Sequence, residues 1–175
     1  FSKGDPEMTE WAKEKFKSAK ASNQGDFTLE TTNDPVLTKC YPPGSPRVYF
    51  HPYPFEFVHT PKFTLMMFEY DHWTRRIWTD GRKPSDDPDP SWMGSSVGHW
   101  ENDTTFVVET NGFNDKTWID RRGHPHSTEM TLKETFRRLD FDRAARPRED
   151  PLTALGIDPE DGALARVSES PFRRA

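Results

Sequence analysis

The most concentrated group of chemically active side chains lies in the segment 112–127. It holds two histidines two residues apart, His124 and His126, and the carboxylates Asp115 and Asp120. In an extended chain, residues two apart point the same way, so both imidazoles could serve one proton transfer or one metal ion. A carboxylate could orient an imidazole or act as a ligand itself. Three interpretations stay open: catalysis or ligand binding by His124, His126 and Asp115, metal ligation by His124, His126 and Asp120, and a plain solvated loop.

A second candidate is Glu134, which falls on the same alternation as Met130 and Phe136 in a strand-like segment. A carboxylate on an apolar face costs several kcal/mol unless it is paired or hydrogen-bonded. We therefore predict that Glu134 is more than half buried and faces the interior. Its role is then either general acid or base chemistry, or a structural ion pair with Arg76 or Arg138.

Aromatic residues make up 13% of the chain, and five of the six tryptophans fall between residues 73 and 118. They could form the core of the domain, or they could line a pocket in which a flat ligand stacks. An arginine in such a pocket could bind a carboxylate of the ligand. The candidate ligand-binding residues are Tyr70, Arg76, Trp78, Trp100 and Trp118.

Composition excludes several classes of protein. A chain of 175 residues fits one domain, and its net charge of −5 does not indicate nucleic acid as a partner. No stretch of 18 apolar residues is present to form a membrane helix. The one cysteine, Cys40, excludes an internal disulfide and a cysteine-rich zinc site, and we expect it to be a buried structural thiol. Nucleotide-binding and metalloprotease motifs are absent, and we expect no cofactor.

Local signals place the elements that must position these residues. The segment 7–20 predicts a helix that Thr9 caps, and the proline-rich segment 21–63 predicts irregular structure with short extended runs at 47–50 and 55–59. Two hairpins follow, and then one alternating strand. The predicted strands are 64–70 with 75–79, 97–100 with 105–111, and 128–139.

Consecutive hairpins with long loops predict a mainly β fold. We expect an antiparallel, strongly curved sheet or a small lipocalin-like β-barrel, with a short N-terminal helix and long loops. The predicted organisation is an N-terminal helix and linker (1–33), a β-barrel-like domain (34–140) and an atypical polar tail (141–175). The tail is expected to be disordered or to dock onto a partner, because it has few large apolar residues.

Several strings between Asp34 and Asp140 are distinctive as a set. They are DPVLTKCYPPGSPRVYF, FEYDHWTRRIWTDGR, DPSWMGSSVGHWENDTTFVVETNGFNDKTWID, and RGHPHS followed by KETFRRLD. In these strings the sequence resembles a family of uncharacterised exported bacterial proteins. The resemblance implies a periplasmic or secreted location, and it implies no particular reaction. Residues 141–175 depart from the strand-like continuation that such proteins usually have.

The first functional hypothesis is an exported small β-barrel that binds a hydrophobic or aromatic small molecule, with acid/base catalysis by Glu134 and His124 or His126. The second is a non-catalytic accessory or structural subunit, which would contact a protein partner through residues 34–63 and 141–175. The third is a metal-dependent hydrolase that uses His124, His126 and a carboxylate.

Overall fold

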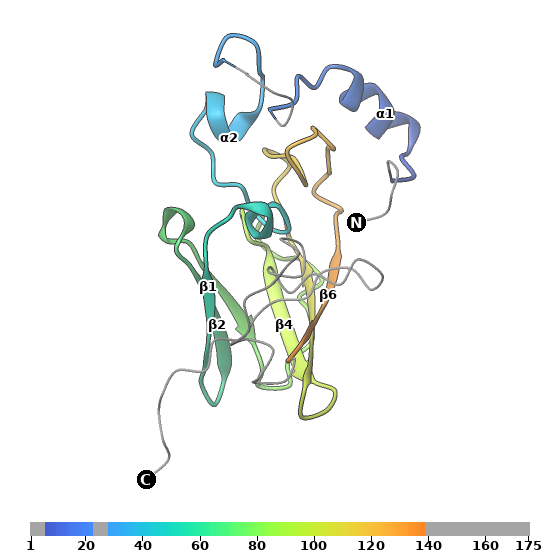
Figure 1. The fold of residues 1–175 in the computed structure, drawn as a ribbon. Helices are drawn as coiled ribbons and strands as arrows, with labels where there is room; N and C mark the ends of the chain where they lie inside the picture. The colour runs from blue at the N-terminus through green and yellow to red at the C-terminus, as the bar shows by residue number, and fades with distance from the viewer. Residues whose placement is uncertain (1–5, 23–27, 139–175) are drawn as a thin grey trace.

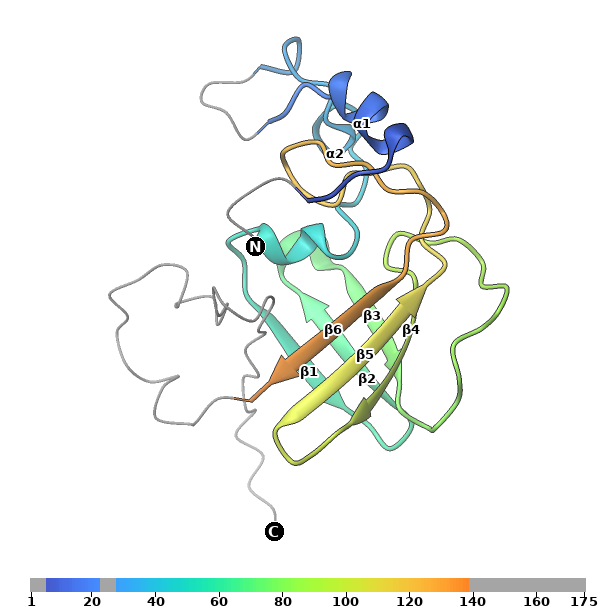
Figure 2. The ribbon, with the colours of Figure 1, turned by 90° about the vertical axis from the view of Figure 1, so that its right-hand side faces the viewer.

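The centre of the molecule is a six-stranded sheet that curls into a half-barrel (Figures 1 and 2). The structure is a computed structural model that describes residues 6–22 and 28–138. The strands are β1 (Phe55–His59), β2 (Phe63–Phe68), β3 (Thr74–Trp78), β4 (Ser95–Trp100), β5 (Thr105–Asn111) and β6 (Leu132–Arg137). The predicted mainly β fold with a curved sheet and a short N-terminal helix is therefore confirmed. The tail predicted for 141–175 lies outside the described residues.

The strands lie in the sheet in the order of the chain. Both predicted hairpins, β2–β3 and β4–β5, are present, and the pairs β1–β2 and β5–β6 are antiparallel as well. The prediction of an antiparallel sheet fails at one joint, because β3 and β4 are parallel and share only two residue pairs. The polar loop 79–94 carries the chain back far enough for β4 to start beside the end of β3. Within the described residues β1 and β6 do not pair, so the sheet is open and not a closed barrel.

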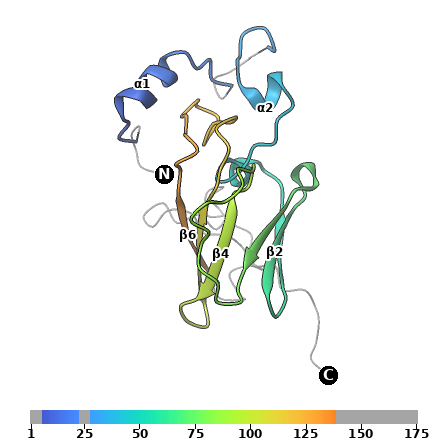
Figure 3. The same ribbon diagram turned by 180° about the vertical axis from the view of Figure 1, so that it is seen from behind.

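Two helices and the loop 112–131 gather at one end of the sheet, the upper end in Figure 1 (compare Figure 3). The helices are α1 (Glu10–Lys17) and α2 (Pro35–Thr38). Two short 3-10 turns follow in the chain: η1 (Arg47–Phe50) lies between α2 and β1, and η2 (Tyr70–His72) lies between β2 and β3. Thr9 caps α1 as predicted, since its hydroxyl accepts a hydrogen bond from the backbone N–H of Ala12.

The extended conformation predicted for 47–50 is wrong, because these four residues form the turn η1. A run of four residues is too short for its pattern to distinguish a strand from a turn. The turn sends successive side chains in different directions, so that Arg47 reaches Asp34 while Tyr49 reaches Arg75. An extended chain would send both to the same side.

Aromatic and aliphatic side chains fill the inside of the half-barrel. Its buried members are Val48, Phe57, Met66, Phe68, Ile77, Met93, Phe106, Val108 and Phe136. The turn η1 supplies Val48, and it also packs the ring of Tyr49 against Phe68 and Phe136 at centroid distances of 5.7 and 6.3 Å. Burying an aromatic side chain stabilises a fold by about 1.5–3 kcal/mol, so this cluster supplies much of the driving force for folding.

A charged pair lies inside this apolar interior. Arg75 is 1% exposed and Glu134 is 5% exposed. The guanidinium donates to both carboxylate oxygens of Glu134, to the hydroxyls of Tyr49 and Thr110, and through Nε to Ser96. These contacts use all five N–H groups of the arginine. Burial raises the pKa of the Tyr49 hydroxyl, so this group stays protonated.

The position of Glu134 was predicted correctly, and its partner was not. Glu134 and Phe136 face the interior, whereas Met130 precedes β6, which starts at Leu132 and not at Thr128. The ion-pair partner is Arg75, not Arg76 or Arg138. The prediction of a buried thiol is also wrong, because Cys40 is exposed.

Replacing Glu134 with Gln should destabilise the domain by about 3–5 kcal/mol, because it leaves the buried charge of Arg75 without a counter-ion. The matched control is Glu109→Gln, which removes a carboxylate from the exposed pair with Lys133 on the same sheet and should cost less than about 1 kcal/mol. Urea denaturation gives both values. A loss below about 1 kcal/mol for Glu134→Gln would show that the pair is not a structural requirement.

Candidate functional site

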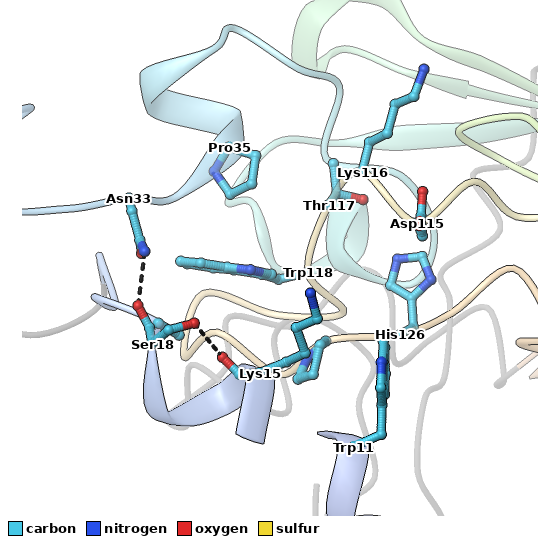
Figure 4. A pocket seen from close by; sticks show the side chains of 12 residues that line it. Trp11, Lys15, Ser18, Asn33, Pro35, Asp115, Lys116, Thr117, Trp118 and His126 are labelled. Atoms are coloured by element: carbon cyan, nitrogen blue, oxygen red, sulfur yellow. Dashed lines mark hydrogen bonds between the residues drawn. The ribbon is translucent and has the colours of Figure 1, made fainter. Parts of the chain in front are cut away.

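A pocket of about 220 Å³ lies between α1 and the loop 115–126, at the end of the sheet that carries the helices (Figure 4). Three separate segments of the chain form its walls. The lining residues are Trp11, Lys15, Ser18, Ala19, Asn33, Pro35, Asp115, Lys116, Thr117, Trp118, Pro125 and His126. The pocket therefore exists only when the N-terminal segment docks onto the loop.

The helix α1 supplies Trp11 and Lys15, which lie four residues apart and so share one face. None of its residues is fully buried. Two contacts connect α1 and the residues after it to the loop. The ring of Phe16 stacks on the imidazole of His124 at 4.6 Å, and Ala19 packs directly against Gly123.

Asp120 organises the loop opposite α1. One of its carboxylate oxygens accepts hydrogen bonds from the backbone N–H groups of Arg122, Gly123 and His124, and the other lies 2.6 Å from Nδ1 of His124. Because a carboxylate accepts, the imidazole donates from Nδ1, which fixes its tautomer. A carboxylate thus orients one imidazole of this segment, and the contact holds the turn together.

His126 is the histidine that lines the pocket, with Asp115 beside it (Figure 4). Its Nδ1 lies 3.4 Å from the carbonyl oxygen of Ser127. A carbonyl only accepts, so Nδ1 carries the hydrogen and Nε2 keeps its lone pair. Burial lowers the pKa of His126 below the ordinary value, against opposing effects of the Ser127 carbonyl and Asp115. At neutral pH this imidazole is uncharged and can accept a proton or a hydrogen bond.

A buried ion pair supports the wall at Asn33 and Pro35. Arg47 in η1 donates to both carboxylate oxygens of Asp34, at 2.9 and 2.6 Å, and Ser22 donates to one of them. Burial alone would raise the pKa of Asp34, but the hydrogen bonds from Arg47 and Ser22 lower it below its ordinary value. The pair ties the N-terminal segment to the turn that fills the half-barrel.

The structure does not gather the five predicted ligand-binding residues into one pocket. Trp118 lines the pocket, whereas Tyr70 packs on His51. Arg76 lies over the ring of Trp78 on the outer side of the sheet. Trp100 ends β4 at the opposite end of the sheet and is 44% exposed.

Two of the four predicted catalytic residues line the pocket, namely His126 and Asp115. His124 faces Phe16 and Asp120, and Glu134 is held by Arg75 inside the half-barrel. Within residues 6–22 and 28–138 no three His, Cys, Asp or Glu side chains are placed to hold a metal ion, and this includes His124, His126 and Asp120.

Sequence reasoning missed the contribution of α1 to this site. The available signal was the i, i+4 spacing of Trp11 and Lys15 on a helix whose apolar stripe also contains Phe16. On the docked helix the side chain of Trp11 remains 46% exposed.

Replacing Gly123 with Ala should weaken the docking of α1. Gly123 has φ +100°, which a side chain disfavours, and an added Cβ would lie 2.5 Å from Cβ of Ala19. We expect a loss of about 1–3 kcal/mol in urea denaturation and a shift of the Trp11 indole signal in the NMR spectrum.

The double variant Ala19→Gly with Gly123→Ala separates the two causes. It should recover the part of the loss that comes from the contact, while the part due to φ remains. If the effects of Ala19→Gly and Gly123→Ala on the free energy of unfolding simply add in the double variant, the close packing of Ala19 on Gly123 does not hold α1 in place.

The contribution of Asp34 to stability should depend on pH. The pKa of Asp34 is lowered in the folded state from the ordinary value of 3.8, so the native state binds fewer protons than the unfolded state. The stabilisation that ionised Asp34 gives to the fold is therefore complete above pH 3.8, and it is lost as the pH falls from there through the pKa of the folded state.

The comparison of wild type with Asp34→Asn tests this dependence. The difference in free energy of unfolding should be largest at neutral pH and should shrink in acid. Glu30→Gln, which removes an exposed carboxylate of the same segment, is the control. A gap between wild type and Asp34→Asn that stays constant down to about pH 2 would contradict the role given to the ion pair.

Comparisons with protein-family models, with curated proteins and with solved structures found no match for this chain. Within the described residues, no helix has both the length and the apolar character that are needed to span a membrane.

Proposed function

We propose that this domain binds a hydrophobic or aromatic small molecule in the pocket between α1 and the loop 115–126. The observation that carries the proposal is the convergence of two indoles, Trp11 and Trp118, in one pocket (Figure 4). Pro35 and Pro125 add apolar surface to the same walls. Flat aromatic and proline surfaces with a few polar groups are typical of small-molecule sites.

The interior of the half-barrel is a poorer candidate for the ligand. Its aromatic side chains contact one another, with Phe57 and Phe136 at a centroid distance of 5.2 Å. Its polar groups also bind one another, since Arg75 occupies both oxygens of Glu134. A ligand there would have to displace side chains that stabilise the fold.

The size of the pocket limits the ligand to a small molecule. Apolar cavities of about 150 Å³ bind benzene, and drug-sized ligands need about 300 Å³ or more. The volume of this pocket, about 220 Å³, lies between these values. A molecule with one ring, or two fused rings, and a short polar group matches this volume.

The pocket binds its ligand without catalysis, because the four predicted catalytic residues do not share one site. Within it, His126 serves as a neutral hydrogen-bond acceptor. A protein partner that contacts residues 34–63 and 141–175 stays a prediction, and residues 141–175 lie outside the described residues. A periplasmic or secreted location is a further proposal, and its support is the resemblance to exported bacterial proteins.

The exposed tryptophans offer a matched test. Trp11 lines the pocket and Trp100 does not, yet their exposed fractions are 46% and 44%. Titration with indole, followed by two-dimensional NMR, should shift signals of residues 11–19 and 115–126. Trp11→Ala should weaken indole binding by about tenfold, and Trp100→Ala should leave it unchanged within about twofold. Equal losses for both variants, or shifts centred on the half-barrel cluster, would refute the site.

A further inference from the structure

Two opposite charges line the pocket without partners of their own. Lys15 extends its amino group from α1 toward the ring of Trp118, and Asp115 lies on the far side, next to His126 (Figure 4). Among the described residues, neither side chain makes an ion pair or a hydrogen bond. Lys116 also lines the pocket, but its amino group lies over the ring of Trp92 and points away (Figure 4).

Lys15 and Asp115 lie on opposite walls of the pocket and do not pair with each other. Lys13, on the same helix as Lys15, binds Glu10 at 2.7 Å. Lys15 and Asp115 border one pocket of about 220 Å³ and still lie too far apart for an ion pair. The indoles of Trp11 and Trp118 belong to the same walls. A ligand that matches both charges must therefore carry two opposite charges of its own and an apolar group.

We infer that the ligand is a zwitterion of amino-acid size with a flat apolar side group. Its carboxylate pairs with Lys15, its ammonium group pairs with Asp115, and its side group lies against Trp11 and Trp118. This inference rests on the proposed function, since it names the ligand class of the same pocket.

The neutral imidazole of His126 suits this arrangement. Its Nε2 accepts, so it can take a further hydrogen of the ammonium group beside Asp115. A protonated imidazole at this place would repel an ammonium group. The lowered pKa, which burial causes, keeps the imidazole neutral at physiological pH.

Charge matching also predicts which analogues are rejected. A ligand with one charge pairs with either Lys15 or Asp115 and leaves the other, exposed charge to water. Such an analogue loses one of the two charge-assisted hydrogen bonds that the zwitterion makes. The selectivity should therefore be larger than apolar contact alone would give.

Four probes that share one phenyl-ethyl skeleton test the inference on the intact chain. L-Phenylalanine carries both charges, 3-phenylpropionate carries only the negative one, 2-phenylethylamine carries only the positive one, and 2-phenylethanol carries none. Titration by NMR or calorimetry at low salt should show L-phenylalanine binding at least about tenfold more tightly than each of the others.

Variants assign each charge to its residue. Lys15→Met should remove the advantage of L-phenylalanine over 2-phenylethylamine, and Asp115→Asn should remove its advantage over 3-phenylpropionate. The control Lys13→Met removes a charge from the same helix outside the pocket and should change neither ratio. Lys15 and Asp115 are both exposed, so these variants should fold.

The outcomes separate the two proposals. If all four probes bind in the pocket with equal affinity, or if a singly charged probe binds best, the zwitterion is overturned while the binding pocket stands. If neither indole nor any phenyl-ethyl probe shifts the signals of residues 11–19 and 115–126, the proposed function is overturned together with the ligand class.

Discussion

The guanidinium of Arg75 imposes the strictest requirement on this fold. A charge in an apolar interior is tolerated only when every donor is satisfied, and Arg75 has five. Its partners come from η1, β4, β5 and β6, while Arg75 itself belongs to β3. One side chain thus fixes four strands and a turn at the same point. A sheet that did not bring these elements together at this point would leave donors of Arg75 unpaired.

The turn η1 connects the ion pair inside the sheet to the wall of the pocket. Its Tyr49 accepts from Arg75 within the half-barrel, and two residues earlier Arg47 holds Asp34. Asp34 caps α2 and stands next to Asn33 and Pro35 in the pocket wall. The pocket is consequently supported by an interior ion pair on one side and by the loop around Asp120 on the other. Its walls combine the N-terminal segment with a loop that lies about 100 residues later in the chain.

Local signals in the sequence were sufficient to predict helices and strands, and they were insufficient to predict which side chains and segments contact one another. The cap at Thr9, the two hairpins and the inward alternation at Glu134 depend on neighbouring residues, and all three are present. The choice between Arg75 and Arg76 depends on which one shares a face with Ile77, and in β3 that residue is Arg75. The pocket required the docking of α1 on residues 115–126. That contact joins distant parts of the chain, and no local pattern encodes it.

The agreement between strand order and chain order has a consequence for how the domain acquires its structure. Every strand pairs with the one before it, so three of the five pairings close loops of five residues or fewer, while β3–β4 and β5–β6 close the longer loops 79–94 and 112–131. Such a topology has many local contacts, which favours rapid folding. The contact between Arg75 and Glu134 spans 59 residues and cannot form until β4, β5 and β6 have assembled. We therefore expect the short-loop pairs β1–β2, β2–β3 and β4–β5 to form before β3–β4 and β5–β6, with the desolvation of Arg75 as the late event that separates a loosely packed sheet from the native state.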